Sequence, residues 1–363
     1  MASSDPFLAY VGCRTSRERN ARGDGITVWR VGPNGGWTKI QTVGDLFNPS
    51  WLGFDRTKRR LYAVHGDASE ISAFRIGADG KLTFLNRQST QGKNPVHLAV
   101  DPSNRFVVVA NHVTQDGFVS NVAVLPLGQD GALQPVVDMV KLEGKIGPHR
   151  VEQPFPKPHQ AEFDPSGRWV IVPDKGCDLV RVYSLGADGK LAASPAPPAV
   201  AREGSGPRHV ALHPSKPWAY LVNELDSTVV AYRFDPAKGS LAPFQVLPSL
   251  PDTFTGDSRA SEIALSADGR FLYASNRGQD SVAVFRIHPT SGRLTPIEWA
   301  ASGGKTPRFF ALSPNGQRLY AANEDSDSIV AFRIDAAGLL SEAGQQIKTG
   351  SPTCIVFSDP KRA

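Results

Sequence analysis

Residues 206–227 read GPRHVALHPSKPWAYLVNELDS. Two apolar runs, VALH and AYLV, flank a Pro-Ser-Lys-Pro turn, a pattern typical of a β-hairpin. The ends of this hairpin are unusual because polar and ionisable groups gather there. Arg208 and His209 precede the first run, and Asn223 and Glu224 follow the second. Both the apolar middle and the charged ends need an explanation.

The same hairpin pattern recurs along the chain, which is the mark of a repeat architecture. Related segments begin at Asn48, Asn94, Lys157, Arg259, Thr306 and, in shortened form, Ser351. After each complete hairpin comes a third alternating segment, such as STVVAYRF, then a Gly-containing turn and a short fourth strand. Four strands per unit at a period of roughly 45–60 residues predict the blades of a β-propeller.

The last repeat ends after one strand, and its missing strands are found at the other end of the chain. FLAYVG at residues 7–12 supplies the second strand, and GITVWRV at residues 25–31 supplies the third. Such a composite blade removes the exposed sheet edge of an open ring. We therefore predict one all-β domain over residues 1–363. It is a seven-bladed propeller of four-stranded antiparallel blades, closed by the N- and C-terminal strands.

Composition excludes several classes of protein. The 363-residue chain has a net charge of only +5 and no Lys/Arg run of five or more, so no nucleic-acid partner is expected. No apolar run is long enough to span a membrane, and no signal peptide is evident. Cys13, Cys177 and Cys354 form neither a disulfide framework nor a CxxC pattern. We expect a cytoplasmic protein with reduced thiols and no obligate protein partner.

Antiparallel pairing puts the start of strand one and the end of strand two at the same edge of each blade, beside the central channel. Two columns of residues result. The first column contains Ser50, Val96, His159, Arg208, Ser261, Arg308 and Thr353. The second column contains Gly66, His112, Lys175, Glu224, Arg277, Glu324 and Cys13. Polar positions that vary between repeats are the candidates for function.

Four of these residues come from consecutive repeats and are expected to converge: His159, Arg208, Glu224 and Arg277. Two arginines can hold a carboxylate or phosphate and stabilise an oxyanion. His159 and Glu224 can move protons, and His159 is preferred because nearby arginines keep a carboxylate ionised. The predicted substrate-binding neighbours are His209, Asn223, Glu262, Asn276, Arg308 and Lys175.

Simpler interpretations of these features stay open. Arg208 and Glu224 could be an ion pair joining two strands, which adds little stability, and His159 could cap a turn. The insertions at residues 140–159 and 247–262 could carry ligand contacts or be surface loops. No metal-ligand spacing and no Walker, Rossmann or nucleophile-elbow motif is present, so no metal or cofactor is expected.

Taken together, the motifs resemble the seven-bladed propeller lactonase family, which includes propeller-type 6-phosphogluconolactonases and 3-carboxy-cis,cis-muconate lactonizing enzymes. The stretches that carry the resemblance are KPHQAEFDPSGRWVIVPDKG, GPRHVALHPSKPWAYLVNELDSTV, FTGDSRASEIALSADGRFLYASNRGQDSVAVF and TPRFFALSPNGQRLYAANEDSDSI. The resemblance implies metal-independent chemistry on an acidic lactone. It assigns the active site to His159, Arg208, Glu224 and Arg277.

The first repeats depart from the family pattern. AVHGD replaces a VNE-like ending, and GCRTSRERNARGDG is long and basic. Arg14, Arg17 and Arg19 could contact an anion there, but we favour a solvated loop. Three functions stay open. The first is a lactonase that hydrolyses an acidic sugar lactone, such as 6-phosphogluconolactone or an aldonic or aldaric acid lactone. The others are a muconate-type lactonizing cycloisomerase and a non-catalytic protein-binding propeller.

Overall fold

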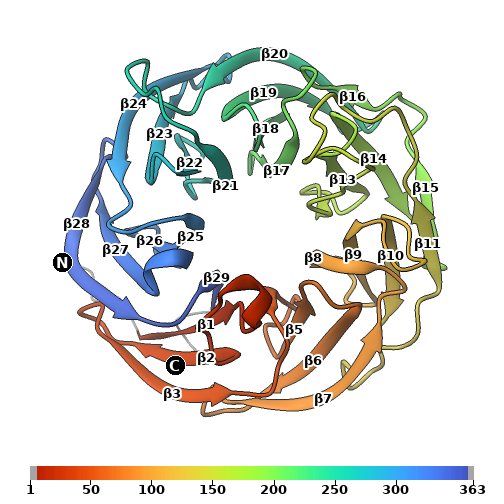
Figure 1. Cartoon of the computed structure of the whole chain (residues 1–363), viewed down its shortest axis with the longest axis horizontal. Helices are drawn as coiled ribbons and strands as arrows, with labels where there is room; N and C mark the ends of the chain where they lie inside the picture. Colours follow the sequence, from red (N-terminus) through yellow and green to blue (C-terminus); the bar gives the residue numbers. More distant parts are fainter. Residues whose placement is uncertain (1–5, 359–363) are drawn as a thin grey trace.

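Residues 6–358, which the computed structural model describes, form a ring of seven β-sheets around a common axis (Figure 1). Each sheet is one blade, whose antiparallel strands follow one another outward from the axis. We number the blades in chain order and call the axial region between their innermost strands the channel. The predicted seven-bladed, all-β architecture is confirmed.

Blades 1 to 3 occupy the first half of the chain. Blade 1 contains β4 (Pro49–Phe54), β5 (Arg60–His65), β6 (Glu70–Ile76) and β7 (Leu82–Ser89). Blade 2 contains β8 (Lys93–Val100), β9 (Phe106–Val113), β10 (Asn121–Pro126) and β11 (Asp138–Lys141). Blade 3 contains β12 (Glu162–Phe163), β13 (Trp169–Asp174), β14 (Leu179–Leu185), β15 (Leu191–Ala193) and β16 (Ala199–Val200), which pairs with β14.

Blades 4 to 6 are regular four-stranded units. Blade 4 contains β17 (Pro207–Leu212), β18 (Trp218–Asn223), β19 (Thr228–Asp235) and β20 (Ser240–Pro248). Blade 5 contains β21 (Arg259–Leu265), β22 (Phe271–Arg277), β23 (Ser281–Ile287) and β24 (Leu294–Ala301). Blade 6 contains β25 (Pro307–Leu312), β26 (Arg318–Asn323), β27 (Ser328–Ile334) and β28 (Leu340–Lys348). The described residues also form two short 3-10 helices, η1 (Arg17–Arg19) and η2 (Glu324–Ser326).

Blade 7 is built from both ends of the chain. Its innermost strand is β29 (Pro352–Phe357), followed outward by β1 (Phe7–Cys13), β2 (Ile26–Val31) and β3 (Trp37–Val43). β1 and β29 pair antiparallel and lie side by side in Figure 1, which confirms the predicted composite blade. Hydrogen bonding between them satisfies the edges that an open ring would expose.

A bulge at the start of the inner strand turns a side chain toward the channel. In blade 4, Pro207 lies opposite Asn223 and His209 lies opposite Val222, so Arg208 is an extra residue on β17. The preceding Gly206 has φ +67°, and a Cβ there would lie 2.7 Å from the Leu225 side chain. Bulges of this kind re-aim side chains, and similar register shifts occur at the inner strands of blades 1, 2, 5, 6 and 7.

Neighbouring blades are joined through tyrosines of their second strands. The Tyr220 hydroxyl of β18 donates to the Gly292 carbonyl of blade 5 at 2.9 Å, and the Tyr273 hydroxyl of β22 donates to Gly338 of blade 6 at 3.1 Å. The aromatic rings are fully buried between sheets. Each contact combines burial of a large apolar ring with satisfaction of its polar end, which fixes the spacing between blades.

Candidate active site

The charged ends of the blade 4 hairpin meet side chains from both neighbouring blades. Glu224, directly after β18, accepts hydrogen bonds from Lys175 Nζ on Oε1 at 2.7 Å and from Arg208 Nε on Oε2 at 3.0 Å. Arg277, at the end of β22, places Nη2 3.3 Å from the same Oε2. All four side chains are largely buried. Glu224 therefore holds three cations together, and the predicted convergence of blades 3, 4 and 5 is present.

His159 lies beside this cluster at the inner edge of blade 3. Its backbone N–H donates to the Pro173 carbonyl at 3.0 Å, which fixes it opposite the end of β13. The side-chain Nδ1 lies 3.1 Å from Nε2 of His209. The other nitrogen, Nε2, makes no hydrogen bond within the described residues, 6–358. That nitrogen is available to a water molecule or a ligand.

Burial and charge set the ionisation of these groups. Burial lowers the pKa of His159 well below its usual range, and the Arg208 charge acts in the same direction. Burial by itself raises the pKa of Glu224, but Lys175, Arg277 and Arg208 outweigh it and hold that pKa well below its usual range. Burial and Arg277 lower the pKa of Arg208 to about 9. At neutral pH the cluster therefore contains a neutral imidazole, an ionised carboxylate and protonated guanidinium groups.

The two insertions in the repeat meet over the cluster. Glu152, in the insertion at residues 140–159, accepts a hydrogen bond from Lys175 Nζ on Oε2 at 3.0 Å. Its Oε1 accepts a hydrogen bond from Arg259, which lies in the insertion at residues 247–262. Both insertions therefore bring charged groups to this mouth of the channel. Sequence analysis did not single out Glu152 or Arg259, although each lies in a segment noted for its extra length.

The second column needs one correction in blade 7. Cys13 lies opposite Pro352 there, as Asn223 lies opposite Pro207 in blade 4. The assignment of Cys13 to the column was therefore wrong by one residue, and Arg14 holds that position. The sequence does contain a signal for the correct alignment. In five blades, the residue of the second column lies four places after a tyrosine of strand two. These tyrosines are Tyr10, Tyr62, Tyr220, Tyr273 and Tyr320.

Arg14 is part of the charged mouth and not of a solvated loop. It is buried, and its Nε lies 2.8 Å from Glu324 Oε1. Arg308 Nη1 lies 3.6 Å from the other oxygen of Glu324. Arg17, by contrast, is exposed, and Arg19 is an exposed side chain that contacts Asp67. The charged mouth therefore extends from blade 3 to blade 7, and its cations outnumber its carboxylates.

Three predicted substrate contacts lie elsewhere. The Asn223 amide donates to Thr228 Oγ1 in its own blade, and the Asn276 amide donates to the Ser249 carbonyl of the segment that joins blades 4 and 5. Glu262 lies deeper in the channel, where its Oε2 is 3.1 Å from His209 Nδ1. Antiparallel pairing places the backbone of these residues near the mouth, but their hydrogen-bond partners decide where the side chains point.

A small void lies within the charged mouth, and a large cavity lies at the opposite end of the channel. The void measures about 20 Å³, room for one water molecule, and His159, Arg208 and Arg308 are among its walls. The opposite cavity, which we call the far cavity, measures about 810 Å³. Trp51 and Phe309 border both spaces and separate them.

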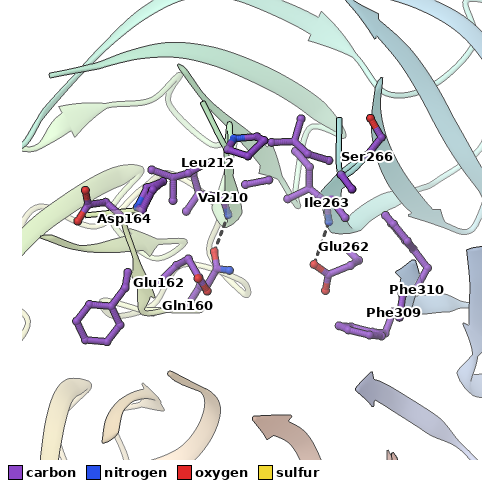
Figure 2. A pocket seen from close by; sticks show the side chains of 18 of the residues that line it. Gln160, Glu162, Asp164, Val210, Leu212, Glu262, Ile263, Ser266, Phe309 and Phe310 are labelled. Carbon is purple, nitrogen blue, oxygen red and sulfur yellow. Dashed lines mark hydrogen bonds between the residues drawn. The ribbon is translucent and has the colours of Figure 1, made fainter. Parts of the chain in front are cut away.

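Size alone would favour the far cavity as the ligand site, but its chemistry does not suit an acidic ligand. Figure 2 shows carboxylates of Glu162, Asp164 and Glu262 around it, together with apolar walls. Arg56 is the one cation among the residues lining it. Because an anion would be repelled by these carboxylates, the charged mouth is the better candidate for binding an acidic substrate.

Other features of the described residues bear on the sequence predictions. Cys13, Cys177 and Cys354 are buried free thiols, and the Cys13 thiol donates to the Gly25 carbonyl. Within residues 6–358, no group of three or more His, Cys, Asp or Glu side chains is placed to hold a metal ion. No helix in that part of the chain is long and apolar enough to cross a membrane.

Comparison with known proteins agrees with the seven-bladed fold and identifies the family. The family model described as "Lactonase, 7-bladed beta-propeller" matches residues 8–357. The chain therefore belongs to the seven-bladed β-propeller lactonase family, and it is a lactonase, an enzyme that hydrolyses cyclic carboxylic esters. The resemblance inferred from the repeat motifs is thus confirmed.

Three individual proteins show how similar the chain is to its relatives. The chain is 37% identical over 268 residues to the 6-phosphogluconolactonase of Bacillus subtilis, covering 73% of this chain and 74% of that protein. A putative 6-phosphogluconolactonase of Bacteroides fragilis superposes with a TM-score of 0.89 at 30% identity, covering 99% of both chains. The periplasmic gluconolactonase PpgL of Pseudomonas aeruginosa also gives a TM-score of 0.89 at 30% identity, covering 98% of this chain and 99% of that one.

Proposed function

We propose that this lactonase hydrolyses an acidic sugar lactone, with 6-phosphogluconolactone as the first candidate, by metal-independent acid and base catalysis. The observation that carries the proposal is the one-water void within the charged mouth, which His159, Arg208 and Arg308 border. A neutral imidazole beside a water site can act as a general base. Relatives named 6-phosphogluconolactonase support the same substrate class.

In this mechanism His159 Nε2 takes a proton from water while the water oxygen bonds to the lactone carbonyl carbon. The carbonyl oxygen becomes an oxyanion, which Arg208 and Arg277 stabilise by charge-assisted hydrogen bonds. The carbonyl then re-forms as the ring C–O bond breaks, and the proton passes from the histidine to the leaving alkoxide. One water is consumed, and the product is the open-chain hydroxy acid.

Glu224 orients the arginines in this mechanism and does not act as the base. Its carboxylate is shared by Lys175, Arg208 and Arg277, and those cations favour its ionised form. A carboxylate with a lowered pKa is a poor proton acceptor near neutral pH. Its shared hydrogen bonds hold the guanidinium groups in fixed positions before the substrate arrives, which is how preorganised electrostatic stabilisation works.

The acidic group of the substrate would bind at the outer part of the mouth. Arg308 and Arg259 are partly exposed there, with 20% and 39% of their side chains accessible, whereas Arg208 is almost fully buried. Accessible arginines suit the phosphate or carboxylate of a sugar acid because their planar donors can make paired hydrogen bonds. Binding such an anion would also offset the positive charge beside His159 and raise its basicity.

A lactone screen tests the proposal. 6-Phosphogluconolactone, gluconolactone, an aldarolactone and a carboxymuconolactone would each be followed by acid release, with spontaneous hydrolysis subtracted. We expect hydrolysis of the phosphorylated lactone by the wild type and a loss of about 100-fold or more in kcat for His159→Gln. Arg286→Gln, on an exposed part of β23, is the matched control for general effects of substitution.

Several results would contradict the proposal. Hydrolysis that is unchanged in His159→Gln and Arg208→Gln would remove the assigned site. Ultraviolet changes on a carboxymuconate without sugar-lactone hydrolysis would identify a cycloisomerase. Activity that is lost with a chelator and regained with a divalent ion would contradict metal independence. No catalysis on any lactone, with a protein partner bound at this mouth, would favour the binding propeller.

We also propose a cytoplasmic location, which fits a phosphorylated substrate and the free thiols of the three cysteines. The P. aeruginosa neighbour is named as periplasmic, so location varies among proteins of this fold. Cell fractionation with cytoplasmic and periplasmic marker enzymes tests this point. Recovery of the protein with the periplasmic marker would contradict it.

A further inference from the structure

Three buried side chains from three consecutive blades form a continuous hydrogen-bonded chain. Glu262 Oε2 lies 3.1 Å from His209 Nδ1, and His209 Nε2 lies 3.1 Å from His159 Nδ1. None of the three residues is more than 6% exposed. His159 borders the one-water void, whereas the Glu262 carboxyl group lies at the far cavity, as Figure 2 shows. The chain therefore links the wall of the void to the wall of the far cavity.

The chemistry of imidazole makes the members of this chain interdependent. A neutral imidazole donates from one nitrogen and accepts on the other. If Glu262 is ionised, His209 must donate from Nδ1 and accept on Nε2, so His159 donates from Nδ1 and keeps a lone pair on Nε2. If Glu262 is protonated, every hydrogen bond reverses and His159 Nε2 carries a hydrogen. One proton on Glu262 thus decides whether His159 faces the mouth as a base or as an acid.

Fixed positive charge makes an imidazolium an unfavourable resting state in this chain. Arg208 Nη1 lies 3.3 Å and 3.4 Å from the two ring nitrogens of His209, and it donates to the Ser261 carbonyl at 2.7 Å. Burial and Arg208 lower the pKa values of both His209 and His159 well below their usual range. A protonated carboxyl group carries no charge, so the proton is better held at Glu262.

We propose that Glu262 is a positioning residue that stores, through His209, the proton that His159 takes from the hydrolytic water. The inference rests on the proposed function, because it assigns a route to the proton of that reaction. As the water proton reaches His159 Nε2, the Nδ1 proton of His159 moves to His209 Nε2, and the Nδ1 proton of His209 moves to the Glu262 carboxylate. The three transfers reverse when the ring oxygen leaves, so protons balance over the cycle.

The surroundings of Glu262 suit this role. From β17, Arg208 favours the ionised form of Glu262 and His209 bonds to it. Glu162, at β12, lies on the same side, where burial and the Glu262 charge raise the pKa of Glu162. Further ionisable groups on this side of the channel are Cys354 of β29, Arg56 after β4, Asp164 after β12 and His97 of β8. Burial dominates and raises the pKa of Glu262 to about 8. The group can therefore gain and lose a proton near neutral pH.

Kinetics of Glu262→Gln test the role of the carboxylate. The amide keeps the shape and can hydrogen bond to His209, but it cannot take up a proton. We expect kcat for the lactone hydrolysed by the wild type to fall by about 100-fold, while KM changes by less than about twofold. Wild-type kcat should rise with pH up to about 8, as Glu262 ionises, and this rise should be absent in Glu262→Gln and partly restored in Glu262→Asp.

Glu162→Gln is the matched control. Glu162 also lines the far cavity, and its Oε2 lies 3.9 Å from His97 Nε2, but it makes no hydrogen bond to the chain from Glu262 to His159. We expect its maximal kcat to equal that of the wild type and its kcat to rise with pH as in the wild type, with a midpoint at or slightly below the wild-type value because one neighbouring negative charge is removed. An unchanged rate and pH profile in Glu262→Gln, or the same loss in Glu162→Gln, would overturn the proposal.

Histidine tautomers give a readout that does not depend on catalysis. Nitrogen-15 spectra of histidine-labelled protein, assigned with His159→Gln and His209→Gln, should show both tautomers switching together near pH 8 in the wild type and not in Glu262→Gln. Tautomers that do not respond to pH would overturn the relay even if lactones are hydrolysed. Coupled switching without lactone hydrolysis would refute the proposed function alone. The wild-type titration decides this even if a variant fails to fold.

Discussion

Arg208 and Glu224 face each other across β17 and β18, with Nε 3.0 Å from Oε2 and both side chains buried. The two residues lie at the two ends of one hairpin, and the repeat pattern already indicates that they are close. They are, however, not an isolated ion pair between two strands. Lys175 and Arg277 reach the same carboxylate from the adjacent blades. The four groups therefore depend on one another, because a buried charge is stable only with its partners.

The first prediction concerns stability. Glu224→Ala leaves three buried cations without their shared carboxylate, so we expect the free energy of unfolding to fall by about 3–5 kcal/mol. Glu70→Ala removes an exposed partner of Arg87 and should change it by less than about 1 kcal/mol. Chemical denaturation measures both. Equal effects would mean that the Glu224 cluster contributes no more than a surface ion pair.

The second prediction concerns the acidic group of the substrate. Arg308→Gln removes a partly exposed cation from the mouth. We expect KM for 6-phosphogluconolactone to rise by about tenfold, which corresponds to about 1.4 kcal/mol, while KM for uncharged gluconolactone changes little. Arg286→Gln is the control for a cation outside the mouth. The same change for both lactones would argue against a phosphate contact.

The third prediction concerns acid stability. Burial, together with Lys175 and Lys157, lowers the pKa of His112 to about 3. The unfolded chain binds that proton near pH 6.5, so it holds more protons than the folded chain between the two values. The stability contributed by neutral His112 is present above pH 6.5 and is lost as the pH falls toward 3, at up to about 1.4 kcal/mol per pH unit.

Replacement of this histidine tests the sign of the effect. In His112→Gln, the free energy of unfolding should depend less steeply on pH between about pH 3 and pH 6.5. The slope should be lower than in the wild type by up to about 1.4 kcal/mol per pH unit. This expectation holds whether or not the substitution changes stability at neutral pH. His288→Gln, in an exposed turn after β23, should keep the wild-type slope. Unfolding by denaturant at a series of pH values gives both slopes. A wild-type slope in His112→Gln would contradict the prediction.

The fourth prediction concerns the contacts between blades. Tyr220→Phe removes the hydroxyl that donates to Gly292 and leaves that carbonyl without its buried partner. We expect a loss of about 1 kcal/mol in stability. Tyr232→Phe is the matched control, because the Tyr232 hydroxyl is buried and has no hydrogen-bond partner among the described residues. Thermal or chemical denaturation compares them, and a larger loss in Tyr232→Phe would contradict this account.

Prediction of the fold succeeded because each blade repeats a local pattern. Strand alternation, the turn residues and the period are all properties of neighbouring positions, and they recur seven times. The truncated unit at Ser351 also revealed the ring closure, since β29 lacks partners in its own segment and β1 lacks a first strand. Antiparallel pairing then located the convergence of His159, Arg208 and Glu224 without any coordinates.

Side-chain direction was less predictable. Assigning Cys13 to the second column was wrong by one residue and left out Arg14. Counting four residues from the recurring tyrosine of strand two would have given the correct residue. Asn223 and Asn276 occupy matching repeat positions, and their amides hydrogen bond to Thr228 and to Ser249, outside the cluster. The direction of a side chain depends on bulges in the strand and on which hydrogen-bond partners compete for it. A sequence pattern specifies neither.

The sequence by itself determined the seven blades, the closure by both chain ends and the residue types at one mouth of the channel, because these follow from repetition and strand pairing. Only the tertiary structure decided that Glu152 and Arg259 meet over Lys175, and that Glu262 reaches His159 through His209. These contacts join residues between 23 and 107 positions apart. Their distances and their burial, which set the charge of each group, exist only once the ring is closed.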